Sequence, residues 1–351
     1  MRVTKLITVL ALLSMFAGAS AFLAFGSEQL PPGMVDTSKY AKAPPWIAGR
    51  AGLGDTNAWM TMFSLHFRYG IEEKYAGLFK DYKVTTCWWN PIQQIADIEY
   101  LVAQQVDILF VDPASEAALA GAIEDAMDAG VPVVLASTRV NTDKFVTWVS
   151  RDNIKAGFLY ATWMAKKLGP NGGKILLFMG VAGSSYAEDV LRGVMQGLSL
   201  YPQIEVVGLA YCDWSPVKAK QAMEAFIQAH PQIDGIICDG GQMALGVVEA
   251  LLDAGRPIPP ITADDWNGWL RIAKEYDIDF LAVSSGCGLA LTCVDLAVQI
   301  LQGKPVPKIV EYPMVVFEKD EIDKYYRPDL NDQYFTVNEL PESWILQYYK
   351  K

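Results

Sequence analysis

The chain has 351 residues, of which 52% are apolar and 20% charged, and its formal net charge is −11. This composition is that of a globular protein, and the length is sufficient for two domains of ordinary size. The acidic balance disfavours binding to phosphate backbones, so we expect no nucleic-acid partner. The five cysteines are odd in number and match no zinc-binding spacing. We interpret them as buried thiols, and we expect neither a metal nor another cofactor.

Residues 1–21 have the pattern of a secretory signal peptide. Arg2 and Lys5 precede a short apolar run, and Ala19-Ser20-Ala21 is a typical cleavage site. An N-terminal anchor helix is the alternative, but small and polar residues interrupt the run before it reaches the roughly 20 apolar residues that a membrane span requires. No cysteine follows it for attachment of a lipid. We therefore predict cleavage after Ala21 and a periplasmic protein, and no later segment is long and apolar enough to span a bilayer.

Residues 22–45 contain Pro, Gly and Ser and are predicted to form an extended leader. Beyond it, strand patterns alternate with helical patterns. Short apolar runs rich in β-branched residues predict strands that are buried on both faces. These runs are Val106–Val111, Val131–Ala136, Lys174–Met179, Val206–Tyr211, Gly235–Cys238 and Phe280–Val283.

Apolar residues repeat at helical spacing between these runs. The predicted helices are Ala58–Tyr75, Ile92–Gln104, Ser115–Ala129, Asn153–Leu168, Ser185–Ser199, Pro216–Ala229, Gln242–Ala254 and Leu289–Gln302. Ser115 and Asp152 are candidate N-caps, and Gly130, Gly255 and Gly303 are candidate C-terminal glycines. Strand–helix–strand units of this length require parallel sheets with right-handed crossovers, and their number fits two doubly wound sheets. Small ligands bind such sheets at the carboxyl ends of the strands.

Short segments along the mature chain resemble, in order and spacing, the type I periplasmic binding proteins of sugar ABC transporters, the ribose-binding-protein group. The segments are Asp55-Thr56-Asn57-Ala58-Trp59, Gln93-Gln94-Ile95-Ala96-Asp97, Ala129-Gly130-Val131-Pro132, Val149-Ser150-Arg151-Asp152-Asn153, His230-Pro231-Gln232-Ile233-Asp234-Gly235 and Leu301-Gln302-Gly303-Lys304-Pro305. Each is weak alone, but their common order extends over nearly the whole mature chain.

The resemblance implies an α/β protein of two doubly wound parallel-sheet lobes joined by a three-strand hinge. It places lobe I at 46–151 with 285–311, lobe II at 152–284 with 312–335, and a C-terminal tail at 336–351. It implies crossovers near Arg151–Asp152, near Ser284–Gly286 and near Glu311–Pro313. It also implies capture of a monosaccharide or polyol by hinge closure, delivery to the membrane permease of an ABC transporter, and a monomer. Cytoplasmic repressors of the same fold carry a DNA-binding headpiece where this chain has its signal peptide.

A sugar presents C–H faces that stack on aromatic rings and hydroxyls that need paired donors and acceptors. Residues of these types follow the predicted strands or stand at the positions that the resemblance implies. The predicted ligand-binding residues are Asn57, Trp59, Trp89, Asn90, Arg139, Arg151, Trp214, Asp239, Asp265 and Ser284. The alternatives are packing for a tryptophan and helix capping for an Asp or Asn at a strand end.

The sequence departs from the family pattern where the family holds its arginines. Ser137-Thr138-Arg139 replaces an Asp-Arg pair, the turn at Ala187-Glu188-Asp189-Val190 contains no arginine, and Gly240-Gly241 stands beside Asp239 where an Asn-Asp pair is frequent. Arg139 or Arg151 is expected to compensate. These departures weaken any specific assignment to ribose and leave a polyol-type ligand open.

A secreted α/β enzyme acting on carbohydrate is the alternative function. His66 lies in a predicted helix and His230 precedes Pro231, so neither is placed as a general base. Gly183-Ser184-Ser185 lacks the glycine spacing of a nucleophile elbow. Two carboxylates such as Asp239 and Asp265 could hydrolyse a glycoside, which spacing alone does not exclude. We predict a binding protein without catalytic residues; a binding component of a chemoreceptor system would differ only in its partner.

Overall fold

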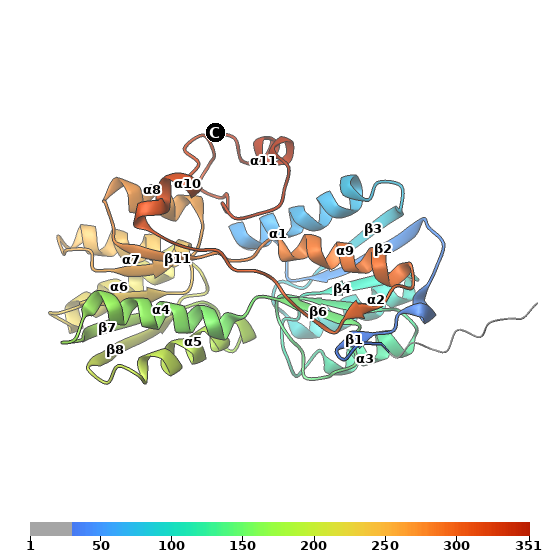
Figure 1. The fold of residues 1–351 in the computed structure, drawn as a ribbon, viewed down its shortest axis with the longest axis horizontal. Coiled ribbons are helices and arrows are strands. Elements are labelled where there is room, and N and C mark those ends of the chain that lie inside the picture. Colours follow the sequence, from blue (N-terminus) through green and yellow to red (C-terminus); the bar gives the residue numbers. More distant parts are fainter. Residues whose placement is uncertain (1–29) are drawn as a thin grey trace, which may run out of the picture.

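The computed structural model describes residues 30–351, and the predicted signal peptide lies outside them. The chain forms two lobes side by side, each built on a six-stranded sheet with helices on both faces (Figure 1). The strand order is β3-β2-β4-β5-β6-β13 in the first sheet, which defines lobe I, and β8-β7-β9-β10-β11-β14 in the second, which defines lobe II. Neighbouring strands are parallel except for β14, which runs antiparallel to β11. Two doubly wound lobes were the prediction, and the structure confirms it.

The parallel strands of both sheets end at the interlobe cleft, whereas the antiparallel β14 begins there. In lobe I they are β2 (Trp46–Gly52), β3 (Phe79–Thr86), β4 (Ile108–Val111), β5 (Val133–Ala136), β6 (Thr147–Ser150) and β13 (Ile309–Glu311). In lobe II they are β7 (Gly173–Met179), β8 (Ile204–Tyr211), β9 (Gly235–Cys238), β10 (Ile261–Ala263), β11 (Phe280–Val283) and β14 (Val316–Glu318). The central strands β4, β5, β9 and β11 are buried at every residue, as strands covered on both faces must be.

The helices cover both faces of each sheet. Lobe I has α1 (Ala58–Tyr69), α2 (Pro91–Ala103), α3 (Ala120–Asp128) and α9 (Leu289–Leu301). Lobe II has α4 (Asn153–Leu168), α5 (Ser185–Leu198), α6 (Pro216–Ala229), α7 (Gly241–Asp253), α8 (Asn267–Glu275) and the short α10 (Ile322–Tyr325). The side chain of Asp152 caps α4 by accepting from the Lys155 N–H at 2.9 Å. The C-terminal glycines of the sequence prediction, Gly130, Gly255 and Gly303, all have positive φ.

Three expectations differ from the structure. Ser115 accepts from the Ala118 N–H in a turn, and α3 begins only at Ala120. The edge strand β3 was missed because its two faces are only half-buried, so it has no continuous apolar run. The leader is not an extended tether where the structure describes it: β1 (Met34–Val35) pairs with β12 (Val306–Pro307), and the Tyr40 side chain is buried against lobe I.

The chain passes between the sheets three times, from β6 to α4, from β11 to α9, and from β13 to β14. The C-terminal segment then lies across both lobes, with α11 (Glu342–Tyr349) above the hinge in Figure 1. Asn267 of lobe II donates to the Arg327 carbonyl at 2.9 Å, and the Trp344 ring meets Tyr69 of lobe I at 5.5 Å. The tail therefore packs on both lobes beside the hinge.

The five cysteines are buried free thiols, as the sequence suggested. Within residues 30–351, no helix combines the length and the apolar character that a membrane crossing would need. The same part of the chain contains no group of three His, Cys, Asp or Glu side chains arranged to hold a metal ion.

Candidate functional site

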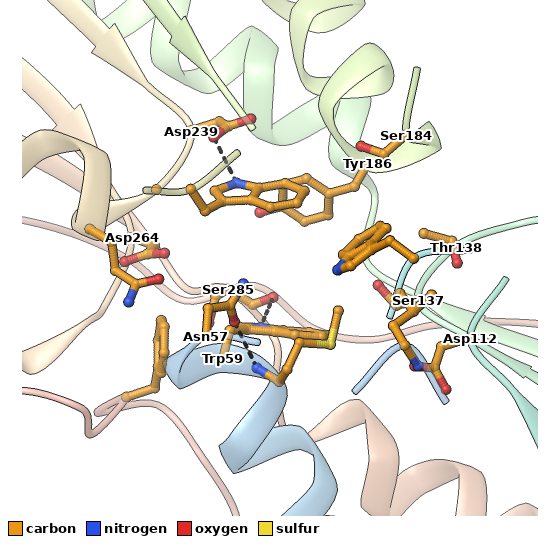
Figure 2. A pocket seen from close by; sticks show the side chains of 17 residues that line it. Asn57, Trp59, Asp112, Ser137, Thr138, Ser184, Tyr186, Asp239, Asp264 and Ser285 are labelled. Carbon is orange, nitrogen blue, oxygen red and sulfur yellow. Dashed lines mark hydrogen bonds between the residues drawn. The ribbon is translucent and has the colours of Figure 1, made fainter. Parts of the chain in front are cut away.

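A cavity that is partly open to solvent lies between the lobes at the carboxyl ends of their strands (Figure 2). Both lobes and the C-terminal segment contribute to its wall. The lining residues are Leu53, Asn57, Trp59, Met60, Trp89, Asp112, Ser137, Thr138, Ser184, Tyr186, Trp214, Asp239, Gly240, Gln242, Asp264, Ser285 and Phe335. Most strands of the two sheets are followed by one of these residues, which is the ligand position expected of doubly wound sheets.

Trp59 forms the lobe I wall. It stands in the first turn of α1, whose N-cap Asn57 accepts from the Met60 N–H at 3.0 Å. One face of the indole stacks on Phe63, with ring centroids 4.6 Å apart, and its Nε1 donates to the Ser285 carbonyl at 3.3 Å. The ring is therefore fixed by lobe I and by the hinge, and it lines the cavity (Figure 2).

Trp214 forms the lobe II wall. Its Nε1 donates to Asp239 Oδ1 at 3.0 Å, and the Gly180 N–H donates to Asp239 Oδ2 at 3.0 Å. The ring lies so close to the backbone that a Cβ at Gly180 would stand 2.0 Å from Trp214 Cε2. Tyr186 meets the same indole edge-on, with centroids 5.6 Å apart. A glycine, a carboxylate and a second aromatic ring therefore determine the orientation of Trp214.

Trp89 adds a third indole at the mouth of the cavity. It follows β3 of lobe I, and its ring lies 6.3 Å from that of Trp214 in lobe II, at an interplanar angle of 34°. Both tryptophans also line a wider outer hollow, so they separate the inner cavity from the cleft entrance. The lobes are in contact at this point.

Three carboxylates line the cavity, and their surroundings differ. Asp112 is bonded by the buried Arg50 guanidinium at 3.2 Å to each oxygen. Burial raises the pKa of Asp239 to about 7, although the Gly180 N–H and the Trp214 N–H oppose the shift. Burial, and then the neighbouring Asp265, raise the pKa of Asp264 to about 7 as well. The lobe I carboxylate is thus paired with a cation, whereas the two in lobe II form no ion pair within the described chain.

Five of the ten predicted ligand-binding residues line this cavity: Asn57, Trp59, Trp89, Trp214 and Asp239. The other five are Asn90, Arg139, Arg151, Asp265 and Ser284, which are adjacent to the cavity in sequence or in space without lining it. Asn90 is exposed and caps α2, with Oδ1 accepting from the Ile92 N–H at 3.0 Å. The side-chain contacts of Asn90 are therefore those of a helix cap, which was the alternative to ligand binding.

The two arginines face other groups. Arg139 pairs with Asp189 and with Glu116, the latter at 3.1 Å, which joins lobe II to lobe I outside the cavity. Arg151 is buried behind Tyr186, donating to its hydroxyl, to the Ser284 carbonyl and, at 3.0 Å, to Asn153. Neither guanidinium replaces the arginines that the family pattern holds at the ligand.

Asp265 and Ser284 organise the hinge. The Asp265 carboxylate accepts from the Ser285 N–H and from the Val337 N–H, each at 2.7 Å. Ser284 Oγ accepts from the Val315 N–H at 2.9 Å, which ties the second crossover to the third. These side chains hold the strands that connect the lobes. Their sequence neighbours line the cavity: Asp264 precedes Asp265, and Ser285 follows Ser284.

Several lining residues were missed. Asp112 and Ser137 directly follow β4 and β5, so the rule of looking after each strand could have found them. Tyr186 and Gln242 stand in the first turns of α5 and α7, which also begin at this edge. Phe335 comes from the C-terminal segment, where no periodic pattern marks it. Only the path of the chain across the hinge brings it to the cavity.

Comparison with known proteins agrees with the fold. Residues 56–305 match the periplasmic binding protein domain family. The chain belongs to this family. A ribose import binding protein of Bacillus subtilis is 31% identical over 222 residues, which are 63% of this chain and 72% of that protein. A xylitol-binding protein of Mycolicibacterium smegmatis is 29% identical over 66% of each chain.

Solved structures of the family superpose well. An ABC transporter solute-binding protein from Thermobispora bispora matches with a TM-score of 0.77 at 25% identity, over 87% of this chain and 94% of that one. These periplasmic binding protein relatives are binding proteins rather than enzymes, which confirms the prediction of ligand capture without catalysis. The periplasmic binding protein fold also accounts for the position of the cavity between two lobes.

Proposed function

We propose that this protein captures a small polyhydroxylated ligand, a sugar or a polyol, in the interlobe cavity and releases it by opening of the hinge. The names of the ribose-binding and xylitol-binding relatives support this ligand class. The lining supports it on chemical grounds, because aromatic faces suit the C–H surface of a sugar and carboxylate, amide and hydroxyl groups suit its hydroxyls.

The single observation that carries the proposal is the pair of aromatic walls. Trp59 comes from α1 of lobe I and Trp214 from the loop after β8 of lobe II, and both line one cavity. A ligand between them contacts both lobes only while the lobes are closed, so its binding energy shifts the open–closed equilibrium. A shift from 1:99 to 99:1 needs about 5.5 kcal/mol of differential binding.

Calorimetric titration with a panel of pentoses, hexoses and sugar alcohols tests the proposal, with small-angle scattering of each binding pair. We expect at least one compound to bind and to lower the radius of gyration. Binding without any change in scattering would contradict the closure mechanism. Failure of the whole panel to bind to folded protein would contradict the ligand class.

The partner and the location belong to the same proposal. We infer that the closed monomer delivers its ligand to the membrane permease of an ABC transporter. We also infer that residues 1–21 direct export to the periplasm and are removed after Ala21. N-terminal sequencing of the exported protein should find Phe22 first. An exported protein that still begins at Met1 would contradict the signal-peptide assignment.

A further inference from the structure

The cavity has an unusual charge. Among residues 30–351, none of the side chains that line it is a lysine, an arginine or a histidine, whereas three are aspartates. Arg50 neutralises one of them, Asp112, through two hydrogen bonds of 3.2 Å. Arg151 is buried close to Asp239 and Asp264, but its guanidinium donates to Asn153, to the Ser284 carbonyl and to Tyr186 instead. When the two lobe II carboxylates are ionised, no bonded cation of the described chain offsets their negative charge.

Asp264 is the carboxylate best placed to meet a cation. It is 7% exposed and lines the cavity (Figure 2). Its recorded hydrogen bonds come from backbone N–H groups, that of Trp266 at 3.1 Å and that of Gly241. These donors orient the carboxylate but bring no positive charge. A buried carboxylate without a cationic partner is costly, and a cationic ligand would offset that cost.

The aromatic walls point in the same direction. Trp59, Trp89 and Trp214 line the cavity, and within the described residues no lysine or arginine lies over any of these three rings. The face of a tryptophan ring attracts cations, and the attraction grows when water is excluded. An ammonium group in this cavity would find both a carboxylate and aromatic faces.

We propose that the ligand carries a protonated amino group besides its hydroxyls, so that it is an amino sugar or an amino polyol whose ammonium is bound by Asp264. This inference rests on the proposed function, since it specifies the ligand of the same cavity. The amino group replaces the positive charge that arginines supply in the family pattern. Asp239 is held by Gly180 and Trp214, and it adds negative potential rather than a direct contact.

The pKa of Asp264 is raised to about 7, so binding of an ammonium group should change how many protons the protein holds at pH 7. The charged groups around it are Asp265, which raises this pKa, and Arg151, which lowers it. An ammonium would favour the ionised carboxylate, so binding at pH 7 should release protons. The heat of binding should then differ between phosphate and Tris buffers, whereas a neutral sugar should show little difference.

The test is calorimetric titration of the full chain with matched pairs. The amines are D-glucosamine, D-galactosamine, D-mannosamine and glucamine, and the neutral partners are D-glucose, D-galactose, D-mannose and D-glucitol. We expect at least one amine to bind about 30-fold or more tightly than its partner, the scale of a buried charge pair. Its N-acetyl form, which keeps the bulk and loses the charge, should bind as weakly as the neutral compound.

Asp264→Asn should remove the preference and bring the amine to within about threefold of its neutral partner. Asp277→Asn is the matched control: it removes one negative charge from an exposed side chain that pairs with Lys319 outside the cavity lining, and the preference should remain. The ligand-free melting temperature of each variant shows whether it folds. If Asp264→Asn does not fold, the matched amine and neutral compounds titrated against the wild-type protein, together with the proton release, test the proposal.

The outcomes separate the two proposals. A neutral sugar or polyol that binds as tightly as its amine in every binding pair would overturn the charge inference and leave the proposed function intact. If none of the eight compounds binds to the folded wild-type protein, the charge inference is contradicted, and the pentoses and other sugar alcohols of the first panel decide the proposed function. An amine preference that survives in Asp264→Asn would move the ammonium site away from this residue and overturn the assignment.

Discussion

Trp89 and Trp214 meet across the cleft at a tilted angle of 34°, with ring centroids 6.3 Å apart, although they belong to different lobes. Their local sequences correspond: Cys87-Trp88-Trp89-Asn90-Pro91 follows β3, and Cys212-Asp213-Trp214-Ser215-Pro216 follows β8. Both tryptophans have positive φ, as do the residues before them, and both precede a helix that opens with proline. The two lobes thus present equivalent turns to each other, and their tryptophans meet at the cavity mouth.

This contact predicts that Trp89 stabilises the closed form of the ligand-free protein. Trp89→Ala removes one ring of a pair worth about 0.5–1.5 kcal/mol, so the closed-to-open ratio should fall about 2- to 12-fold. Small-angle scattering without ligand should show a larger radius of gyration. Trp88→Ala is the control, since that ring is 66% exposed in the same turn and should leave the scattering unchanged. Equal scattering from both variants would show that the contact does not hold the lobes together.

Trp214→Ala should weaken ligand binding far more than it weakens the fold. The ring offers a cavity wall and is only partly buried against the core of lobe II, so affinity should fall by about 2–4 kcal/mol, or about 30- to 1,000-fold. Titration with the best-binding compound measures the change. Trp59→Ala should lose comparable affinity but also some stability, because one face of that ring packs on Phe63.

Trp269 supplies the control for these variants. It is fully buried in the core of lobe II, so Trp269→Ala should cost about 3–5 kcal/mol of unfolding free energy while the folded fraction keeps its affinity. If Trp214→Ala gave this second pattern instead, Trp214 would be a packing residue and the lobe II wall would have to be reassigned.

Gly180→Ala tests the backbone contact that orients the Trp214 ring, while Trp214 itself is left unchanged. The added Cβ would lie 2.0 Å from Trp214 Cε2, so the ring must move away from its position. We expect affinity to fall about tenfold or more, which corresponds to the usual 1–3 kcal/mol of overpacking. Gly121→Ala in α3 is the control, because nothing lies within 4 Å of its added Cβ and a helical alanine should stabilise. Unchanged affinity in Gly180→Ala would mean that the ring orientation does not matter for binding.

The stability of the ligand-free protein should depend on the ionisation of Asp264. Its folded pKa of about 7 is higher than the unfolded value of about 3.9, so its contribution to stability is complete below about pH 4 and is lost as the pH rises through 7. Asp264→Asn removes this loss. At pH 8 the variant should therefore have a higher unfolding temperature than wild type, and its unfolding free energy should be larger by at least about 1 kcal/mol. Both differences should vanish near pH 4.

Thermal unfolding of both proteins across this pH range provides the measurement. Asp277→Asn is again the control, since it changes the net charge equally at an exposed position. A variant that is less stable than wild type at pH 8 would show that the carboxylate is needed for its backbone hydrogen bonds more than it is penalised for its burial.

Much of the fold follows from local patterns in the sequence. Continuous apolar runs identified β4, β5, β7, β8, β9 and β11, and helical repeats identified eight of the major helices, because burial on both faces or on one face leaves a direct periodic signature. The elements that were not predicted include β2, β3, β6, β10 and α8; the edge strand β3 is half-exposed, and β10 and α8 are short. Strand ends then located Trp214 and Asp239, since parallel strands bring their carboxyl ends to one edge.

The sequence by itself thus determined two doubly wound lobes with aromatic and acidic residues at their facing edges. Only the tertiary structure decided which side chains reach the cavity. Arg139 turns to Asp189, Arg151 turns to Tyr186, and Phe335 arrives from a tail that crosses the hinge. The reason is that a charged side chain takes the nearest partner that compensates its burial, and such partners come from segments far away in the chain. The charge of the cavity is set by those long-range pairings, which no local pattern records.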